Sequence, residues 1–242
     1  MTARTRFDPS LYLVTDTRQC GGPDGVVATV RAAVTGGVTA VQLRDPRATT
    51  RELVDLGHAL VELLRPLGVP LIVDDRVDVA LAIDADGVHV GQQDLDPVSA
   101  RRLLGPGRHL GLSVGTPEQA RTAGDLPAGT VDLLGVGPVR PTLSKADARP
   151  AIGFDGLAAV IAATDLPCVA IGGLGAADVP ALHAAGAAGS AVVSAVCGRP
   201  EPGESARQIT EAWAEARAGR PAAEQAGGSA AERARATDGP AS

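Results

Sequence analysis

The chain has 242 residues, of which 45% are apolar and only 2% aromatic, and its formal net charge is −6. A chain of this length and apolar content is long enough to bury the core of one sizeable domain. Its acidic balance and scarcity of aromatic residues argue against a nucleic-acid partner, which would require basic patches and stacking rings. We therefore expect an enzyme that acts on small molecules.

Three features predict a cytoplasmic protein without a membrane partner. The first residues, MTARTRFDPS, contain no apolar run of the kind found in secretory signals. The Ala/Gly-rich segment 181–196 is too short for a membrane span, contains His183 and is broken by glycines. Cys20, Cys168 and Cys197 are odd in number and lack C-x-x-C spacing, so we expect reduced thiols rather than a disulfide or a metal site.

Short β-branched runs alternate with Ala/Leu-rich segments eight times along the chain, which is typical of βα units in a parallel sheet. Strands are predicted at 11–16, 40–44, 71–75, 87–91, 109–114, 131–137, 168–173 and 190–195. Helices are predicted near 24–36, 49–65, 77–83, 97–104, 117–123, 155–163, 176–185 and 203–218. Eight repeats favour an α/β fold with one closed (β/α)8 TIM barrel over residues 7–218. Small and charged residues predict that 219–242 form a disordered C-terminal tail.

In such a barrel the active site lies at the C-terminal ends of the strands. Asp74 and Asp75 end the third predicted strand, and Asp94 follows the fourth, so these carboxylates are expected on one rim. Mg²⁺ suits them, because it typically takes one or two protein carboxylates together with waters and phosphate oxygens. The spacing is equally compatible with helix capping by Asp75 and by Asp94 or Asp96.

Polar groups suited to phosphate follow other strands. Alternation directs Gln42 and Arg44 to the same side of the sheet, where Arg44 either clamps a phosphate or forms a surface ion pair with Asp45 or Glu52. The sixth connection, PVRPTLSKADARPAIG, is long and polar, as expected of a binding loop or of an ordinary surface loop. Further hydroxyl and cationic groups come from Ser113, Thr142, Ser144 and Lys145.

The seventh predicted strand ends in AIGGLGAAD and the eighth in VVSA, where barrels often hold phosphate with backbone amides. Gly172 and Gly173 would permit close approach of a ligand to the backbone. A dinucleotide fingerprint at 173–178 is the alternative interpretation, but its third glycine is missing. His89 is expected to pack inside the barrel rather than transfer protons, and Trp213 to anchor the last helix.

In order, the chain contains QLR (42–44), DDR (74–76), HVGQQD (89–94), GLS (111–113), GPVRPTLSK (137–145), IGG (171–173) and VVSA (192–195). Over residues 9–215 this pattern resembles the thiamine-phosphate synthase family. The resemblance implies a transferase that joins hydroxymethylpyrimidine diphosphate to a thiazole phosphate, giving thiamine phosphate and pyrophosphate. The implied reaction is dissociative, so it requires no protein nucleophile or base.

The resemblance also implies a role for each matching residue. Mg²⁺ would be bound by Asp75 and Asp94, and the pyrimidine diphosphate by Gln42, Arg44, Ser113 and Lys145, with Asp74 beside it. Arg44, Ser113 and Lys145 would act in catalysis. The thiazole phosphate would be held by Gly173, Val193 and Ser194, with Thr142 and Ser144 on the loop above.

This chain departs from the family pattern at several of these positions. Asp74 stands where the family usually has asparagine, and Pro46 where it has lysine. Arg140 replaces a common aromatic residue, and Ser144 a common threonine. Arg47 or Arg140 is a candidate to compensate for Pro46. Two alternatives therefore stay open, a thiazole tautomerase-like relative and a catalytically silent phosphate-binding barrel; the oligomeric state is not predicted.

Overall fold

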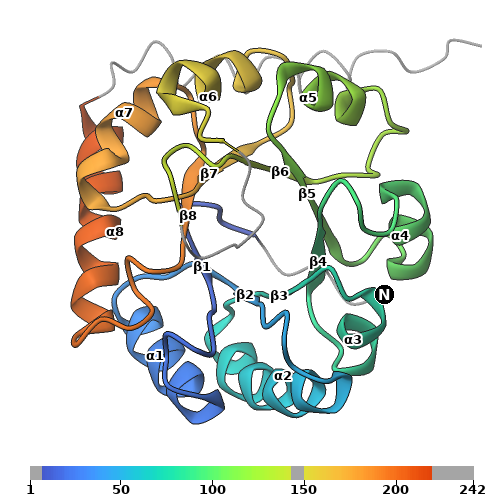
Figure 1. Cartoon of the computed structure of the whole chain (residues 1–242), viewed down its shortest axis with the longest axis vertical. Helices are drawn as coiled ribbons and strands as arrows, with labels where there is room; N and C mark the ends of the chain where they lie inside the picture. The colour runs from blue at the N-terminus through green and yellow to red at the C-terminus, as the bar shows by residue number, and fades with distance from the viewer. Residues whose placement is uncertain (1–6, 143–149, 220–242) are drawn as a thin grey trace, which may run out of the picture.

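The computed structural model describes residues 7–142 and 150–219. Its parallel strands form a closed barrel in sequence order, because β8 pairs with β1, and the helices surround it (Figure 1). The strands are β1 (Leu11–Val14), β2 (Ala40–Leu43), β3 (Leu71–Asp74), β4 (Gly87–Val90), β5 (His109–Val114), β6 (Leu133–Val136), β7 (Cys168–Ile171) and β8 (Gly189–Val192). The predicted (β/α)8 barrel is confirmed.

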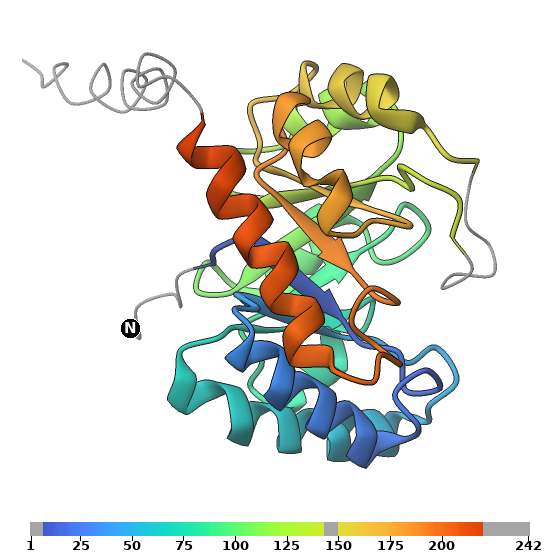
Figure 2. The same ribbon diagram turned by 90° about the vertical axis from the view of Figure 1, so that its left-hand side faces the viewer.

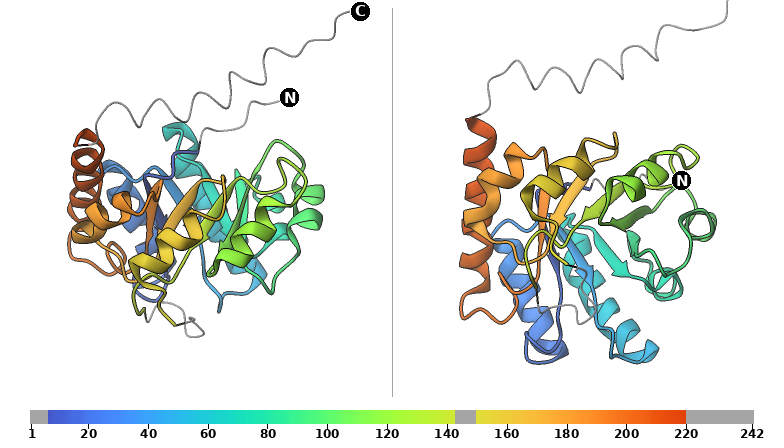
Figure 3. Two further views of the ribbon diagram at one scale, coloured as in Figure 1. Left: turned by 90° about the horizontal axis from the view of Figure 1, so that it is seen from above. Right: turned by 45° about the horizontal axis from the view of Figure 1, so that its top comes forward.

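Each strand is followed by a helix, and the helices lie outside the strands in every view (Figure 3). The helices are α1 (Pro23–Thr35), α2 (Thr50–Leu64), α3 (Val77–Ala82), α4 (Pro97–Leu104), α5 (Pro117–Gly124), α6 (Gly153–Ile161), α7 (Val179–Ala184) and α8 (Pro202–Ala218). Two 3-10 turns were not predicted, η1 (Arg65–Leu67) after α2 and η2 (Ala176–Asp178) before α7. A proline lies near the start of η1, and another lies near the start of α7, directly after η2. Proline lacks a backbone N–H, which helps to explain why these two turns are separate from the neighbouring α-helices.

Local sequence signals explain where several helices begin. Thr49 and Glu52 form a capping box at the start of α2, in which each side chain accepts a hydrogen bond from the backbone of the other. Thr116 caps α5 by accepting from the backbone N–H of Gln119. These caps satisfy backbone donors that have no partner within the helix.

Strand alternation produces two apolar layers. Leu11 and Leu13 belong to the large core between the strands and the helices. Tyr12 and Val14, which alternate with them, belong to a smaller cluster inside the barrel. Residues two apart in a strand share a face. Polar residues at the C-terminal ends of the strands, in line with the inward-facing positions, therefore point into the C-terminal opening of the barrel.

Helix α8 runs along the outside of the barrel and packs against α1 and α7 (Figure 2). Trp213 on α8 is 1% exposed, and its Nε1 donates to Ser190 Oγ on β8 at 3.0 Å. Trp213 is thus the core anchor that the sequence predicts. The predicted tail, 219–242, lies outside the described residues except for Gly219, and none of the helices described is long and apolar enough to cross a membrane.

Candidate active site

A cavity of about 480 Å³ opens at the C-terminal ends of the strands. This volume lies within the usual range for small-molecule sites. Residues predicted for the site that line the cavity are Gln42, Arg44, Asp74, Asp75, Asp94, Ser113, Thr142, Gly173, Val193 and Ser194. The barrel therefore brings all the predicted residues that the structure describes to one place. Ser144 and Lys145 lie outside the described residues.

Gln42 and Tyr12 form a buried polar pair in the wall of this cavity. Gln42 Nε2 donates to Tyr12 Oη at 2.9 Å, and the two side chains are almost fully buried. Burial raises the pKa of Tyr12 well above its usual value, so its hydroxyl remains protonated. This hydrogen bond fixes the position of the Gln42 amide in the cavity wall.

Arg44 and Asp74 form an ion pair across β2 and β3. Arg44 Nε lies 3.2 Å from Asp74 Oδ2, and both side chains are 18% exposed. The backbone of Arg44 is also tied to β1, because its N–H donates to Thr15 Oγ1 at 3.0 Å. Arg44 therefore pairs with Asp74, which lines the same cavity, whereas the surface interpretation required a pair with Asp45 or Glu52.

The structure separates the three carboxylates that sequence spacing left ambiguous. Asp96 is the N-cap of α4 and accepts from Ser99 N at 3.0 Å, a bond that lowers the pKa of Asp96. Asp94 instead accepts from Gly91 N at 2.8 Å, within the loop after β4. Asp75 is not the cap of α3, whose N-cap residue is Arg76. Capping therefore accounts for Asp96 and leaves Asp75 and Asp94 in the cavity wall.

Asp75 has a backbone conformation that is uncommon for a residue with a side chain. Its φ is 57°, in the left-handed region, and its N–H donates to the carbonyl of His89 at 2.8 Å. Such strain persists where surrounding contacts determine it, and it is frequent at functional sites. Here it turns the chain directly after β3 and places the Asp75 carboxylate at the rim.

The donors at this rim fit a cation that shares its coordination with a substrate. Asp75 and Asp94 supply two carboxylates to one cavity. No group of three or more His, Cys, Asp or Glu side chains with the spacing of a metal site occurs in residues 7–142 and 150–219. That donor set suits Mg²⁺ bound through one or two carboxylates, waters and phosphate oxygens, and it does not suit an ion held by protein ligands alone.

Ser113 on β5 is positioned from inside the barrel. His89 Nε2 lies 2.9 Å from Ser113 Oγ, and Gln92 Nε2 donates to the carbonyl of Ser113 at 2.8 Å. A Cβ at Gly111 would lie 2.3 Å from His89 Nδ1, and one at Gly135 would lie 2.9 Å from His89 Cε1. The two glycines therefore create the space that His89 occupies in the barrel interior, as the sequence predicts.

The loops after β6 and β7 pack tightly against each other. Arg140 N donates to the carbonyl of Gly172 at 3.0 Å. Gly173 has a φ of 64°, and a Cβ there would lie 2.7 Å from the carbonyl oxygen of Pro141. This close approach requires glycine and places the backbone of residue 173 in the cavity wall.

Neither candidate proposed to compensate for Pro46 lines the cavity, whereas Pro46 itself does. Arg140 pairs with Asp178 at 2.7 Å, and its guanidinium lies 5.2 Å from the ring centroid of Phe154. Arg47 is exposed and is absent from the cavity lining. The side chain of Arg140 is directed to Asp178 and Phe154 and not into the cavity.

Val193 and Ser194 follow β8 and form the opposite wall. The chain turns immediately after them, since Cys197 N donates to the carbonyl of Val193 at 2.8 Å. Arg199 Nε donates to the carbonyl of Ser194 at 2.8 Å and stabilises the same turn. The turn leaves the side chain of Ser194 in the cavity lining.

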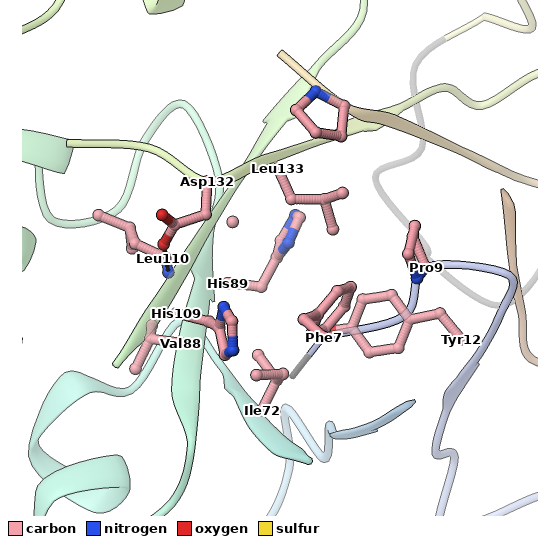
Figure 4. Close-up of a pocket in the computed structure, with 12 residues that line it drawn as sticks. Phe7, Pro9, Tyr12, Ile72, Val88, His89, His109, Leu110, Asp132 and Leu133 are labelled. Atoms are coloured by element: carbon pink, nitrogen blue, oxygen red, sulfur yellow. Dashed lines mark hydrogen bonds between the residues drawn. The ribbon is translucent and has the colours of Figure 1, made fainter. Parts of the chain in front are cut away.

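A second, smaller cavity of about 290 Å³ lies at the N-terminal ends of the strands (Figure 4). Phe7 lies there between His109 and Tyr12, with ring centroids 5.3 and 5.4 Å away. Tyr12, His89 and Leu133 line both cavities. Tyr12 and Leu133 were not predicted for the site, although their inward-facing positions on the strands could have indicated them.

The closed parallel barrel and its C-terminal cavity, lined by acidic, basic and amide groups, define a class, the barrel enzymes that act on small molecules. A family model described as thiamine monophosphate synthase (TMP-TENI) matches residues 11–196. The chain belongs to this family, and its members' named activity makes it a transferase.

Curated relatives and a solved structure agree with this assignment. The chain is 53% identical over 203 residues to the thiamine-phosphate synthase of Azorhizobium caulinodans, covering 84% of this chain and 94% of that one. It is 56% identical over 211 residues to the thiamine-phosphate synthase of Xanthobacter autotrophicus, covering 87% and 98%. A thiamine phosphate pyrophosphorylase structure from Pyrococcus furiosus matches with a TM-score of 0.78 and 37% identity, covering 87% of this chain and 98% of that one.

Proposed function

We propose that the protein transfers the pyrimidinylmethyl group of hydroxymethylpyrimidine diphosphate to the nitrogen of a thiazole phosphate, forming thiamine phosphate and pyrophosphate. The observation that carries this proposal is the convergence of Gln42, Arg44, Asp75, Asp94 and Ser113 on one cavity, from the ends of four consecutive strands. Family membership supports the same activity.

In this proposal the diphosphate binds at the side of the cavity formed by β2 to β5. Arg44 contacts phosphate oxygens, Ser113 donates a hydrogen bond, and Lys145, which lies outside the described residues, is the second cation assigned to the same group. Asp75 and Asp94 would hold Mg²⁺, which would supply neutralisation of charge on the departing diphosphate. Positive charge at the leaving group is what a bond-breaking step of this kind requires, because negative charge develops there.

The thiazole phosphate binds at the opposite wall in this proposal. The backbone of Gly173 and the residues Val193 and Ser194 contact its phosphate, with Thr142 and Ser144 nearby on the sixth connection. The C–O bond to the diphosphate breaks first, and the thiazole nitrogen then captures the pyrimidine-stabilised cation. No side chain accepts or donates a proton in the bond-forming step, consistent with the packing of His89 in the barrel interior.

We also propose that the protein works in the cytoplasm. Its three cysteines are free thiols, the state that a reducing compartment maintains.

The test is to incubate the purified protein with both substrates and Mg²⁺ and to separate the products by chromatography. Thiamine phosphate and pyrophosphate should appear in equal amounts, and omission of either substrate or of Mg²⁺ should abolish both. Isomerisation of the thiazole phosphate without any coupling would instead identify a tautomerase. Binding of thiazole phosphate without turnover of either substrate would identify a silent barrel.

A further inference from the structure

Two cysteines that are far apart in the sequence lie together at the C-terminal end of the barrel. Cys20 is in the loop between β1 and α1, and Cys197 is in the turn after β8. Because β1 and β8 are neighbouring strands, these loops are adjacent. A Cβ at Gly198 would lie 3.1 Å from the carbonyl oxygen of Gln19, so the two backbones are in contact beside the cysteines.

The thiols of Cys20 and Cys197 are close enough for each to shift the pKa of the other, but their surroundings differ. Cys197 is 2% exposed, and its Sγ lies 3.7 Å from the carbonyl oxygen of Val14. Cys20 is only partly buried and packs against the core cluster that contains Cys197. An oxidant in solution therefore meets Cys20 first, with Cys197 directly behind it.

The different surroundings also make the two thiols chemically unequal. The contact with Cys197, helped by Thr29 and nearby backbone groups, lowers the pKa of Cys20. The same contact, together with burial, raises the pKa of Cys197. A thiolate is the nucleophile in thiol–disulfide exchange, so Cys20 is the reactive member of the pair.

We propose that Cys20 and Cys197 form a thiol–disulfide modification site, in which Cys20 reacts first with a small disulfide and Cys197 resolves the mixed disulfide. The co-reactant is a low-molecular-weight disulfide such as oxidised glutathione. The Cys20 thiolate attacks one sulfur of this disulfide and displaces a thiolate, forming a mixed disulfide. Cys197 then loses its proton and attacks Cys20 Sγ, displacing the second thiolate. One small disulfide is reduced to two thiols, and the two cysteines are oxidised to one cystine.

The bond would connect the loops that follow the first and last strands. Cys197 N already donates to the carbonyl of Val193, whose side chain lines the large cavity, so the cystine would stiffen that wall. Formation of the bond is independent of the proposed catalytic function.

The third cysteine provides an internal control. Cys168 begins β7 at the opposite end of the barrel, is buried, and places its Sγ 3.3 Å from the carbonyl oxygen of Leu166. Burial raises the pKa of Cys168 to about 11, which disfavours the thiolate. It should therefore remain reduced under native conditions.

The experiment is native incubation of the full chain with oxidised glutathione, followed by mass spectrometry of the intact protein and its peptides. The wild type and Cys168→Ala should each lose two hydrogens, yield one Cys20–Cys197 cross-linked peptide and recover on reduction. Cys197→Ser should accumulate one glutathione on Cys20, because nothing resolves the mixed disulfide. Cys20→Ser should stay unmodified.

The wild-type result alone decides the proposal, even if a variant does not fold. A stable glutathione adduct on Cys20 of the wild type would overturn it, as would an unmodified protein or a cross-link to Cys168. Thermal denaturation gives a second readout, in which the oxidised wild type should have a higher Tm than the reduced form, since the bond restricts the unfolded chain.

Discussion

Asp94 and Asp96 perform different structural tasks although only one residue separates them. Asp96 caps α4, whereas Asp94 lies in the wall of the large cavity. If Asp94 holds Mg²⁺, Asp94→Asn removes one of two anionic ligands while its amide oxygen still accepts from Gly91 N. We expect the Mg²⁺ concentration for half-maximal activity to rise about tenfold or more, the equivalent of about 1.4 kcal/mol.

Asp96→Asn is the matched control for this measurement. Asparagine caps helices as well as aspartate does, so α4 should keep its stability and the Mg²⁺ titration should not change. Equal Mg²⁺ requirements in the two variants and the wild type would remove Asp94 from the metal site.

The ion pair of Asp74 with Arg44 gives the second prediction. Asp74 neutralises part of the charge that Arg44 would offer to the diphosphate, and its own charge opposes that ligand. Asp74→Asn should therefore tighten binding of the pyrimidine diphosphate. A gain of about 1 kcal/mol, roughly fivefold in Kd, is the expected scale for an ion pair that is partly exposed to solvent.

Calorimetric titration of both forms with the diphosphate, in the presence and absence of Mg²⁺, tests this effect. Weaker binding by Asp74→Asn would mean that Asp74 serves to orient Arg44. A loss of affinity confined to the titration with Mg²⁺ would mean that Asp74 contributes to the metal site.

At the scale of elements, strand β5 depends on a glycine. An alanine at 111 would place its Cβ 2.3 Å from His89 Nδ1, so His89 would have to move away from Ser113. We expect Gly111→Ala to lower the free energy of unfolding by about 1–3 kcal/mol, as overpacking usually does, and to weaken diphosphate binding as well.

Urea denaturation measures the stability of this variant, and Gly107→Ala is its control. Gly107 lies in the turn just before β5, and a Cβ there would meet nothing within 4 Å. Gly107→Ala should therefore be close to neutral. A similarly neutral Gly111→Ala would show that the barrel interior adjusts around His89.

The sequence was sufficient to predict every strand and nearly every helix, because β-branched runs and Ala/Leu-rich segments alternate without ambiguity. It also placed Asp75 and Asp94 on one rim, since parallel strands end together. It did not predict the partners of these side chains. The pairing of Arg44 with Asp74 and the contact of Cys20 with Cys197 depend on strand register and on closure of the barrel, which join residues distant in the chain. The pairing of Arg140 with Asp178 was not predicted for the same reason, because Asp178 belongs to another βα unit.

At the scale of the whole molecule, α8 stabilises the region where β8 pairs with β1 and closes the barrel. Trp213 fills the space between α8 and β8 and donates to Ser190 Oγ. Trp213→Ala should lower the free energy of unfolding by about 3–5 kcal/mol, as large aromatic truncations in cores do.

Trp213→Phe retains most of the ring volume and loses the hydrogen bond to Ser190. It should lower the free energy of unfolding by less than the alanine variant does, and both can be compared by urea denaturation. Equal losses in the two variants would show that the hydrogen bond, rather than the packed ring, secures α8.

Both cavities are lined by Tyr12, His89 and Leu133, so these three side chains lie between the two cavities in the barrel interior. Removal of the Leu133 side chain would thin the layer that separates the two cavities. In a dissociative reaction, water that entered from the smaller cavity would compete with the thiazole nitrogen for the pyrimidine cation. Leu133→Ala should therefore convert part of the diphosphate to the free pyrimidine alcohol. The ratio of that alcohol to thiamine phosphate measures how well these side chains exclude water from the active site.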